Sequence, residues 1–475
     1  MVSGDLHWST VYLAVEWVIR LTMLAIVPQQ RSPAAARTWL LLIFLLPIPG
    51  LVLYGIIGRV YLPRRRIEMQ RRASEVIRLA QKQLPASSTA IDLPEPAAMV
   101  SSLTVALGEF RPFAGNAVEL IAAYEDGIGR LVDDIEAARH EAHLLTYIFA
   151  PDATGTRVSD ALLHAARRGV TCRVVLDAVG SSRGLKQFSH AWRVAGIEVH
   201  AALPMGSLRR RGSRFDLRNH RKIAVIDGSV GYIGSQNIVD PTFIPGYPNE
   251  ELVVRMTGPA VAQLQALFAS DFYFESGRTL DAPASFPKLG ATGSSVVQLL
   301  PSGPAYGREN AKELMVTLAY AARGSIVVTT PYLIPDESFL QALGVAARRG
   351  VDVRIVVSRH ANQRLAQLAQ QSYYEALLDA GVGVYLYRPR FLHAKHMSVD
   401  DDVAMIGSVN ADIRSFSLNA EASLLIYDRA IVASLRGIQD RYFADSERLT
   451  PNAWADRPVA ARMAQNVARL ADSFL

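Results

Sequence analysis

The chain has 475 residues, and 50 Lys and Arg against 44 Asp and Glu give a formal net charge of +6. This length excludes a miniature scaffold, and a single cysteine, Cys172, excludes an intramolecular disulfide and a cysteine-built zinc site. A hydrophobic share of 50% and a mean hydropathy of +0.14 lean apolar without reaching the composition of a polytopic membrane protein. The positive excess suits an anionic partner, whether nucleic acid, an acidic lipid surface or a phosphate substrate.

Two apolar stretches open the chain. The first, Trp8–Val27, holds Glu16 and Arg20 at helical i, i+4 spacing, where they can pair. It is interpreted as a spanning helix, an interfacial helix or a buried core helix. The second, Thr38–Gly58, has 21 uncharged residues and is long enough to cross a bilayer. A kink or a re-entrant shape is expected in its middle, at Pro47, Pro49 and Gly50.

Arginines flank the second stretch unequally. The connection between the two stretches carries only Arg31 and Arg37. The segment that follows carries Arg59, Arg64, Arg65, Arg66, Arg71, Arg72 and Arg78. The positive-inside bias therefore predicts that the bulk of the chain lies in the cytoplasm. This basic run either touches anionic headgroups or forms a solvated helix face.

The remainder of the chain repeats itself. AARRGV occurs at Ala165–Val170 and again at Ala346–Val351, and a short apolar strand follows each copy. The Ser-, Pro- and Ala-rich stretch Ala86–Asn116 predicts a linker with little regular structure. The expected domains are a membrane anchor over 1–60, a basic helix and linker over 61–116, and homologous lobes over 117–280 and 281–475.

Each lobe shows helix and strand patterns in the same order. Helices are predicted over Leu131–Leu145 and Ala311–Arg323, and strands over Leu144–Phe149 and Ile326–Thr330. The strands are apolar without alternation, which indicates sheets covered by helices on both faces. The predicted fold class is α/β, with two α/β/α lobes related by a pseudo-two-fold after two apolar membrane helices.

One polar motif, H-x-K-x4-D-x6-G-S-x-N, occurs once in each lobe with identical spacing. Two copies of a pattern this long are not expected by chance. An Asn-x-Glu follows each copy, at Asn249/Glu251 and Asn419/Glu421. The motif residues are His220, Lys222, Asp227, Ser235 and Asn237 in the first lobe, and His393, Lys395, Asp400, Ser408 and Asn410 in the second.

These residue types suit phosphodiester chemistry without a metal. A histidine and a lysine two residues apart on a strand point to the same face. If the two copies face each other, ammonium groups and neutral donors stabilise charge on the phosphoryl oxygens. One neutral histidine attacks phosphorus, and the other, protonated, gives its proton to the leaving oxygen. We expect no cofactor and no metal, and we interpret His140, His143 and His396 as non-ligands.

The duplicated motif resembles the signature of the phospholipase D superfamily, and its surroundings resemble those of bacterial cardiolipin synthases. The similarity covers nearly the whole chain and includes the N-terminal segment, where Ala36–Leu40, Tyr54 and Gly58 fit the family pattern. The other matching segments are Asn219–Asp240, Val297–Pro304 and Asn410–Glu421.

The resemblance implies a role for each motif residue. His220 would be the nucleophile and His393 the general acid and base. Glu251 and Glu421 would orient the histidines. Asp227 and Asp400 belong to the catalytic signature, although a structural role is expected for them. The phosphate would be held by Lys222, Lys395, Asn237 and Asn410, with support from Ser235 and Ser408.

The implied reaction is the transfer of a phosphatidyl group between two phosphatidylglycerol molecules, which gives cardiolipin and glycerol through a phosphohistidine. The implied partners are phosphatidylglycerol and anionic membrane lipid, with no nucleic acid, and homo-oligomers stay open. The expected location is the bacterial inner membrane, with cytoplasmic catalytic lobes. A further basic run either holds acidic headgroups or is a solvated loop; it comprises Arg209, Arg210, Arg211, Arg214 and Arg218.

Four alternatives remain at this stage: a phospholipase D, a phosphatidyltransferase that uses phosphatidylserine, a nuclease of the same superfamily, and a membrane-anchored scaffold with an inactive site. The apolar N-terminal stretches count against the nuclease, as does the lack of aromatic residues interleaved with the basic runs. Two intact motif copies count against the scaffold.

Overall fold

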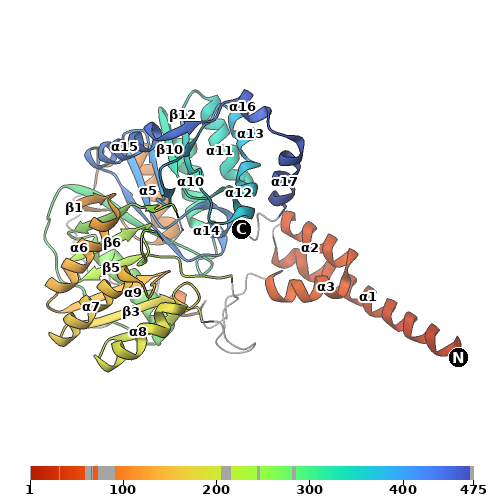
Figure 1. Ribbon diagram of the computed structural model, residues 1–475, viewed down its shortest axis with the longest axis horizontal. Helices are drawn as coiled ribbons and strands as arrows, with labels where there is room; N and C mark the ends of the chain where they lie inside the picture. Colours follow the sequence, from red (N-terminus) through yellow and green to blue (C-terminus); the bar gives the residue numbers. More distant parts are fainter. Residues whose placement is uncertain are drawn as a thin grey trace. The chain divides into compact units, whose positions relative to one another are not determined.

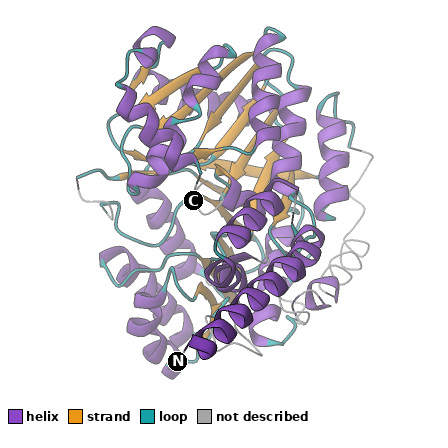
Figure 2. Ribbon diagram, turned by 90° about the vertical axis from the view of Figure 1, so that its right-hand side faces the viewer, coloured by secondary structure: helices purple, strands orange, loops and turns teal. Residues whose placement is uncertain are grey.

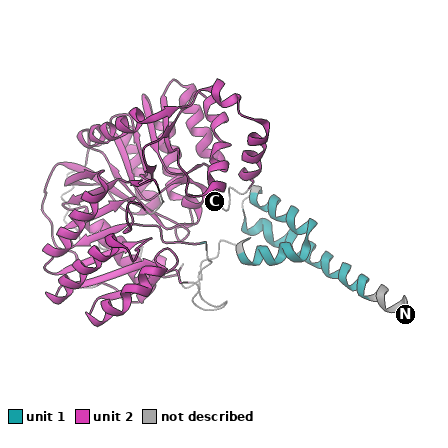
Figure 3. Ribbon diagram, viewed as in Figure 1, with its two compact units in different colours: residues 1–63, 205–216 teal, residues 64–204, 217–475 magenta. Residues whose placement is uncertain are grey.

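A computed structural model describes residues 2–31, 33–58, 66, 68–72, 91–204, 216–242, 246–280 and 285–470. The chain forms two compact units (Figure 3). Unit 1 comprises residues 1–63 and 205–216, and unit 2 comprises residues 64–204 and 217–475.

Unit 1 is helical. Its elements are α1 (Val2–Gln30), α2 (Pro33–Leu45), α3 (Pro47–Leu53) and the π-helix η1 (Tyr54–Gly58). The second apolar stretch is therefore broken where its prolines predicted a kink, since α2 ends before Leu46 and α3 begins at Pro47. A small core joins the pieces, where Trp39 packs edge-on against Tyr54 with ring centroids 5.2 Å apart.

Among the described residues, one helix is long and apolar enough to cross a membrane, over Trp8–Gln30. It lies in the first apolar stretch, and most of its side chains are exposed, so it is not a buried core helix. Arg20 donates a hydrogen bond to Glu16 at 3.1 Å, which confirms the expected i, i+4 pair. The second stretch was expected to span by its length, but the structure divides it into shorter helices.

Unit 2 contains a sheet of 15 strands, ordered β19-β13-β12-β10-β15-β16-β18-β9-β1-β8-β6-β5-β2-β3-β4 (Figures 1 and 2). The strands from the first half of unit 2 are β1 (Phe113–Ile121), β2 (Glu141–Thr146), β3 (Thr171–Asp177), β4 (Glu198–Ala202), β5 (Ile223–Ile226), β6 (Val230–Gly234) and β8 (Val253–Thr257). Those from the second half are β9 (Ser295–Ser302), β10 (Ser325–Thr329), β12 (Asp352–Ser358), β13 (Gly383–Tyr387), β15 (His396–Val399), β16 (Val403–Gly407), β18 (Glu421–Ile426) and β19 (Ser446–Arg448).

The duplication is visible in the strand order. Counted from one edge, the order β4-β3-β2-β5-β6-β8-β1 repeats from the other side as β13-β12-β10-β15-β16-β18-β9, with β19 added outside. The parallel and antiparallel pairings also correspond, because β2, β3 and β4 pair in parallel as β10, β12 and β13 do. The halves join where β1 pairs antiparallel with β9, so both lobes share one sheet.

Helices cover both faces of this sheet. Neighbouring strand residues enter different cores: Leu145 packs in the core with α9 and α15, and Leu144 packs in the core with α6, α7 and α8. The helices of unit 2 in the first half are α5 (Ala97–Gly108), α6 (Tyr124–Ala137), α7 (Ala153–Arg167), α8 (Ser182–Val194) and α9 (Val261–Ser276). Those of the second half are α10 (Asn310–Ala321), α11 (Glu337–Arg348), α12 (Arg364–Gln371), α13 (Tyr374–Asp379), α14 (Ile413–Ser417), α15 (Arg429–Ala444), α16 (Pro451–Ala455) and α17 (Val459–Arg469).

Two sequence predictions about this region were wrong. The expected linker over Ala86–Asn116 holds α5 and the start of β1, because Val100 and Leu107 are buried beside β9. The helix expected over Leu131–Leu145 is α6, which ends at Ala137, since β2 begins at Glu141.

The motif aspartates close turns at the edge of the lobes. Asp227 and Asp400 adopt the left-handed conformation, with φ of 50° and 49°. The carboxylate of Asp400 accepts three backbone N–H groups, from Arg323, Gly324 and Ser325, at 2.7–2.9 Å. Asp227 accepts the equivalent three at the start of β2. Both aspartates thus fix the hairpins inside the motifs, β5–β6 and β15–β16, and this is the kind of structural contact that was expected for them.

Replacing Asp400 with alanine is expected to lower the free energy of unfolding by about 2–4 kcal/mol, because three N–H groups lose their acceptor and alanine disfavours this backbone conformation. Thermal unfolding of the purified protein measures the effect. Asp401→Ala is the matched control, since the Asp401 side chain is 75% exposed in the same turn. Equal melting temperatures for the two variants would contradict the assigned role.

Candidate active site

A cavity of about 380 Å³ lies between the two halves of unit 2. Both motif histidines and both motif asparagines line it. His220 and Asn237 flank the hairpin β5–β6, and His393 and Asn410 flank the hairpin β15–β16. The residues that line it further include Tyr147, Arg218, Asp412, Arg414, Asn249 and Asn419. The two motif copies therefore meet at one site, which is the condition on which the phosphodiester chemistry expected for them depends.

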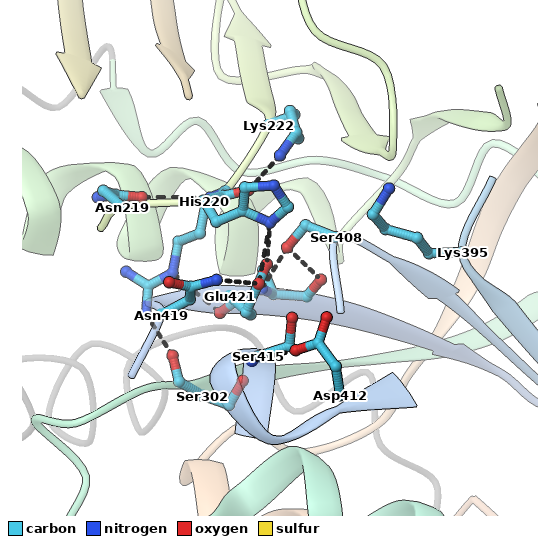
Figure 4. Close-up of polar contacts among 12 residues, drawn as sticks. Asn219, His220, Lys222, Ser302, Lys395, Ser408, Asp412, Ser415, Asn419 and Glu421 are labelled. Atoms are coloured by element: carbon cyan, nitrogen blue, oxygen red, sulfur yellow. Dashed lines mark hydrogen bonds and ion pairs between the residues drawn. The ribbon is translucent and has the colours of Figure 1, made fainter. Parts of the chain in front are cut away.

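Each histidine pairs with the glutamate of the other half. Nδ1 of His220 lies 2.9 Å from Oε1 and 3.0 Å from Oε2 of Glu421 (Figure 4). Nδ1 of His393 lies 2.7 Å from Oε1 of Glu251. A carboxylate can only accept, so Nδ1 carries the proton in both rings, and the neutral rings keep their lone pair on Nε2. Neither half forms a complete histidine site alone.

Backbone hydrogen bonds fix these crossed pairs. The short strand β14 (Phe391–Leu392) pairs in parallel with β7 (Asn249–Glu250), and the N–H of His393 donates to the carbonyl of Glu250 at 2.8 Å. In the other direction, the N–H of His220 donates to the carbonyl of Ala420 at 2.8 Å. The segment before each motif strand is thus tied to the residue before the partner glutamate.

Burial sets the protonation of the pair. It lowers the pKa of His220 to about 4, although the Glu421 carboxylate acts in the opposite direction. Burial also lowers the pKa of His393. The facing histidines hold the pKa of both glutamates below the ordinary value against the effect of burial. The free site at neutral pH thus contains ionised carboxylates and a neutral His220.

The motif lysines lie behind the histidines and are not among the described residues that line the cavity. Nζ of Lys222 donates to the carbonyl of His220 at 2.6 Å, and Nζ of Lys395 donates to that of His393 at 2.6 Å. Lys222 and Lys395 each lie just before the first residue of their strand, β5 or β15. The expectation that each histidine and lysine share one face of a strand was therefore wrong. Burial lowers the pKa of Lys222 to about 7 and of Lys395 to about 8.

The motif serines, which were expected to support the phosphate-binding residues, contact the glutamates. Oγ of Ser235 donates to Oε2 of Glu251 at 2.5 Å and accepts the N–H of Leu252. Ser408 accepts the N–H of Ala422, and its hydroxyl helps to hold the pKa of Glu421 down. Both serines are fully buried.

The asparagines of the site face the cavity. Oδ1 of Asn237 accepts the N–H of Ile148 at 3.1 Å, which leaves its amide N–H groups as donors. Asn410 occupies the same motif position in the other half. Asn249 and Asn419 each direct their amide nitrogen at the adjacent glutamate from 3.4 Å.

Sequence reasoning missed several cavity residues, of which three are polar side chains close to the motif residues. The ring of Tyr147, one residue beyond β2, packs edge-on against His220 with centroids 4.8 Å apart. Asp412 and Arg414 follow Asn410 at the start of α14. The sequence feature that could have revealed them is their position just beyond a strand end or a motif, because side chains at the strand ends of an α/β sheet reach the ligand site.

Of the remaining basic and histidine candidates that the structure describes, only Arg218 lines the cavity. Arg218 lines the cavity and pairs with Asp177 at 3.3 Å, whereas Arg209, Arg210, Arg211 and Arg214 lie outside the described residues. Arg66 forms an ion pair with Glu275 at 2.7 Å. His143 is buried beside Gln265 and His396 beside Gln439. The backbone N–H of His140 donates to the carboxylate of Asp227. From the same basic run, Arg59, Arg64, Arg65 and Arg78 are outside the described residues.

Asp412 carries a stability prediction. Burial raises its pKa to about 6, above the value of about 4 in an unfolded chain, so stability is lost as pH rises through this window. Asp412→Asn keeps an acceptor for the N–H of Ser415, and it is expected to be more stable than the parent at pH 8 by about 2 kcal/mol. Thermal unfolding at pH 8 and pH 4 measures the difference, which should shrink at pH 4. The same change at exposed Asp379 is the control, and an equal effect there would contradict the interpretation.

A duplicated α/β sheet that brings two histidine–glutamate pairs to one cavity defines an enzyme of the phospholipase D-like class. The family model described as "Cardiolipin synthase, PLD-like domain" matches residues 131–272 and 315–442. The chain belongs to this cardiolipin synthase family. It is 32% identical over 480 residues to cardiolipin synthase A of Yersinia pseudotuberculosis and to that of Yersinia pestis, with 97% of this chain and 98% of each relative covered.

A solved structure supports the fold alone. The crystal structure of phosphatidylserine synthase from Haemophilus influenzae aligns with a TM-score of 0.62 at 14% sequence identity. The alignment covers 79% of this chain and all of that one. The region in common includes both halves of the duplicated sheet, since it exceeds the length of either lobe.

Proposed function

We propose that this chain, a phosphatidyltransferase of the cardiolipin synthase family, transfers a phosphatidyl group from one phosphatidylglycerol to another and releases glycerol. The single observation that carries the proposal is the crossed arrangement of two histidine–glutamate pairs at one cavity. It supplies a nucleophile and a proton donor on opposite sides of one phosphodiester, which is what an exchange of alcohols at phosphorus needs.

In the first step, Nε2 of His220 attacks phosphorus and the bond to the headgroup glycerol breaks. His393 takes up a proton at Nε2 before this step, and as an imidazolium it gives that proton to the departing glycerol oxygen. The product is a phosphatidyl group on His220, whose developing positive charge faces the Glu421 carboxylate through Nδ1–H. Because burial keeps His220 neutral, its lone pair is available without prior deprotonation.

In the second step, His393 takes the proton from a free hydroxyl of the second phosphatidylglycerol. That oxygen attacks phosphorus, the bond to Nε2 of His220 breaks, and His220 returns to its neutral form. Over the two steps one phosphodiester bond breaks and another forms, so no high-energy bond is consumed. The Glu251 carboxylate stabilises the His393 imidazolium in both steps.

The lysines and asparagines carry supporting roles in this proposal. Lys222 and Lys395 hold the carbonyls of the catalytic histidines, and their charge lies behind the site where negative charge collects on phosphoryl oxygens. The amides of Asn237 and Asn410 donate to those oxygens from the cavity wall. Ser235 and Ser408 fix the glutamates.

The acceptor lipid carries a phosphate of its own, and two arginines on the cavity wall suit it. Arg218 is held by Asp177, and Arg414 lies in the first turn of α14, just beyond the second motif. A guanidinium reads a phosphodiester by paired hydrogen bonds. An acceptor fixed in this way competes with water for the phosphatidyl-enzyme.

The membrane placement is also part of the proposal. The helix over Trp8–Gln30 would span the bilayer, and the broken α2–α3 pair would form a second, re-entrant membrane segment. The catalytic lobes, one over 117–280 and one over 281–475, would be related by a pseudo-two-fold and face the cytoplasm of a bacterial cell. The equal strand order from both sides of the sheet supports the pseudo-two-fold.

Incubating the purified full chain with phosphatidylglycerol alone tests the function. Cardiolipin and glycerol in equal amounts are expected, with no requirement for a nucleotide. Added glycerol should reverse the reaction, because the exchange is near equilibrium. Formation of phosphatidic acid without cardiolipin would make the chain a phospholipase D and contradict the proposal.

A further inference from the structure

The C-terminal helix α17 presents its apolar residues to solvent. Val459, Met463 and Val467 are each 64% exposed, and Leu470, directly after the helix, is 80% exposed. Their spacing places them on one side of the helix, and these four residues are called the α17 stripe. The opposite side, with Gln465 and Ala468, is the buried one. This reverses the usual pattern of a surface helix, whose apolar side faces the core.

The orientation of α17 is fixed by polar contacts. Gln465 donates to Gln371 of α12 at 3.1 Å, and its carbonyl oxygen accepts from Arg457 at 3.0 Å. The guanidinium of Arg469 lies 4.6 Å from the centre of the Tyr373 ring. The stripe therefore cannot turn inward without breaking these contacts, and it needs a partner that is apolar.

The charge of α17 indicates what that partner is. The helix contains Arg462 and Arg469 and no acidic residue. A helix with an apolar side, flanking arginines and low overall hydrophobicity lies in the interface of a bilayer that contains anionic lipid. The other exposed apolar surface of this kind among the described residues belongs to the N-terminal helices of unit 1.

The stripe lies close to the active site. Helix α17 packs against α12, which has eight residues and is about 12 Å long (Figure 1). The start of α12 lines the cavity through Gln363 and Ala366, and Leu365 beside them is 48% exposed. A bilayer surface in contact with α17 would therefore reach the side of the cavity formed by α12.

We propose that the α17 stripe and Leu365 form a docking surface for an anionic phospholipid bilayer, separate from the N-terminal helices. This surface holds the cavity of unit 2 against the membrane, so that lipid headgroups enter without leaving the interface. The proposal rests on the proposed function only in taking bilayer lipids as substrates. Its first test is a binding measurement that needs no catalysis.

A fluorescent label reports the contact directly. The only cysteine of the chain, Cys172, is buried, so a thiol dye at Met463→Cys labels one exposed site. Val194→Cys is the matched control, since Val194 is 76% exposed at the end of α8 in the other half of unit 2. The full chain is placed in nanodiscs of phosphatidylglycerol and phosphatidylcholine in which some lipids carry a spin label on the acyl chain.

Quenching of the dye at position 463, about threefold or more over that at position 194, is expected. Quenching that falls in nanodiscs of phosphatidylcholine alone would further support the anionic interface. Equal quenching at the two positions would overturn the proposal. A shielded dye in lipid-free detergent would also overturn it, because a second copy or another segment of the chain would then cover the stripe.

Activity gives an independent readout. Met463→Glu with Val467→Glu is expected to lower turnover in nanodiscs about tenfold while leaving turnover of a short-chain, detergent-dispersed phosphatidylglycerol unchanged. Val194→Glu should change neither rate. Equal loss on both substrates would assign a structural role to α17 and overturn the docking surface. A parent chain inactive on both substrates would instead refute the proposed function, and the quenching result would stand.

Discussion

Replacing His220 with alanine is expected to lower the rate of cardiolipin formation by about 10⁴-fold or more. The imidazole is the proposed nucleophile, and no other described side chain at the cavity offers a neutral nitrogen paired with Glu421. Product is measured from radiolabelled phosphatidylglycerol. The fold should persist, because the backbone contact of His220 with Ala420 does not involve the side chain.

His190→Ala is the matched control, since His190 is exposed on α8. It should keep parental activity and a parental melting temperature. A His220→Ala variant that melts like the parent but forms cardiolipin at the parental rate would refute the nucleophile assignment.

Trapping separates the two histidines. Quenching the parent during turnover in a mildly alkaline denaturant, in which a phosphohistidine is stable, should leave labelled lipid on the protein, and peptide mapping should place it on His220. His393→Ala should still acquire the label from a lipid with a nitrophenol leaving group, because that group needs no proton. Label on His393 in place of His220 would exchange the two roles.

Much of this site could be predicted from the sequence because a duplicated motif with fixed spacing predicts chemistry without a structure. His220 and His393 were paired in advance on that ground. The crossing of the glutamates could not be seen, because Glu251 and Glu421 each follow the motif of their own lobe. Glu251 reaches the other half through the pairing of β7 with β14, and Glu421 does so through the hydrogen bond from His220 to Ala420.

The directions of the side chains were the other feature of the site that the sequence could not predict. The spacing placed Ser235 and Lys222 near the histidines, but only packing decides that the hydroxyl turns to Glu251 and the ammonium to a backbone carbonyl. In the fold, α5 was missed because its Ser and Ala content resembles a linker until Val100 and Leu107 are placed against the second lobe. Length alone also could not show which apolar stretch forms one continuous helix. Trp8–Val27 lies within α1, whereas Thr38–Gly58 is divided between α2, α3 and η1.

Replacing Glu421 with glutamine is expected to lower the transfer rate about 10²- to 10⁴-fold, in the range seen when a buried carboxylate is removed from a histidine of a catalytic triad. The amide keeps the volume of the side chain but cannot stabilise the positive charge that forms on His220. Loss of the carboxylate also lowers the pKa of His220 further, so the defect should persist across pH 5–8. Steady-state rates of the purified variant measure it, and the double variant with His220→Ala should be no slower than His220→Ala alone.

Glu251→Gln is the matched variant in the other pair, and the two should differ in one respect. Glu251 acts on the proton donor His393, so a lipid whose leaving group is nitrophenol should restore the first step of Glu251→Gln, because that oxygen departs unprotonated. The same lipid should not restore Glu421→Gln, whose defect lies in the attack on phosphorus. Restoration of both variants, or of neither, would show that the crossed glutamates do not divide the work as the nucleophile and acid assignment requires. Restoration of Glu421→Gln alone would reverse that assignment and make His393 the attacking residue.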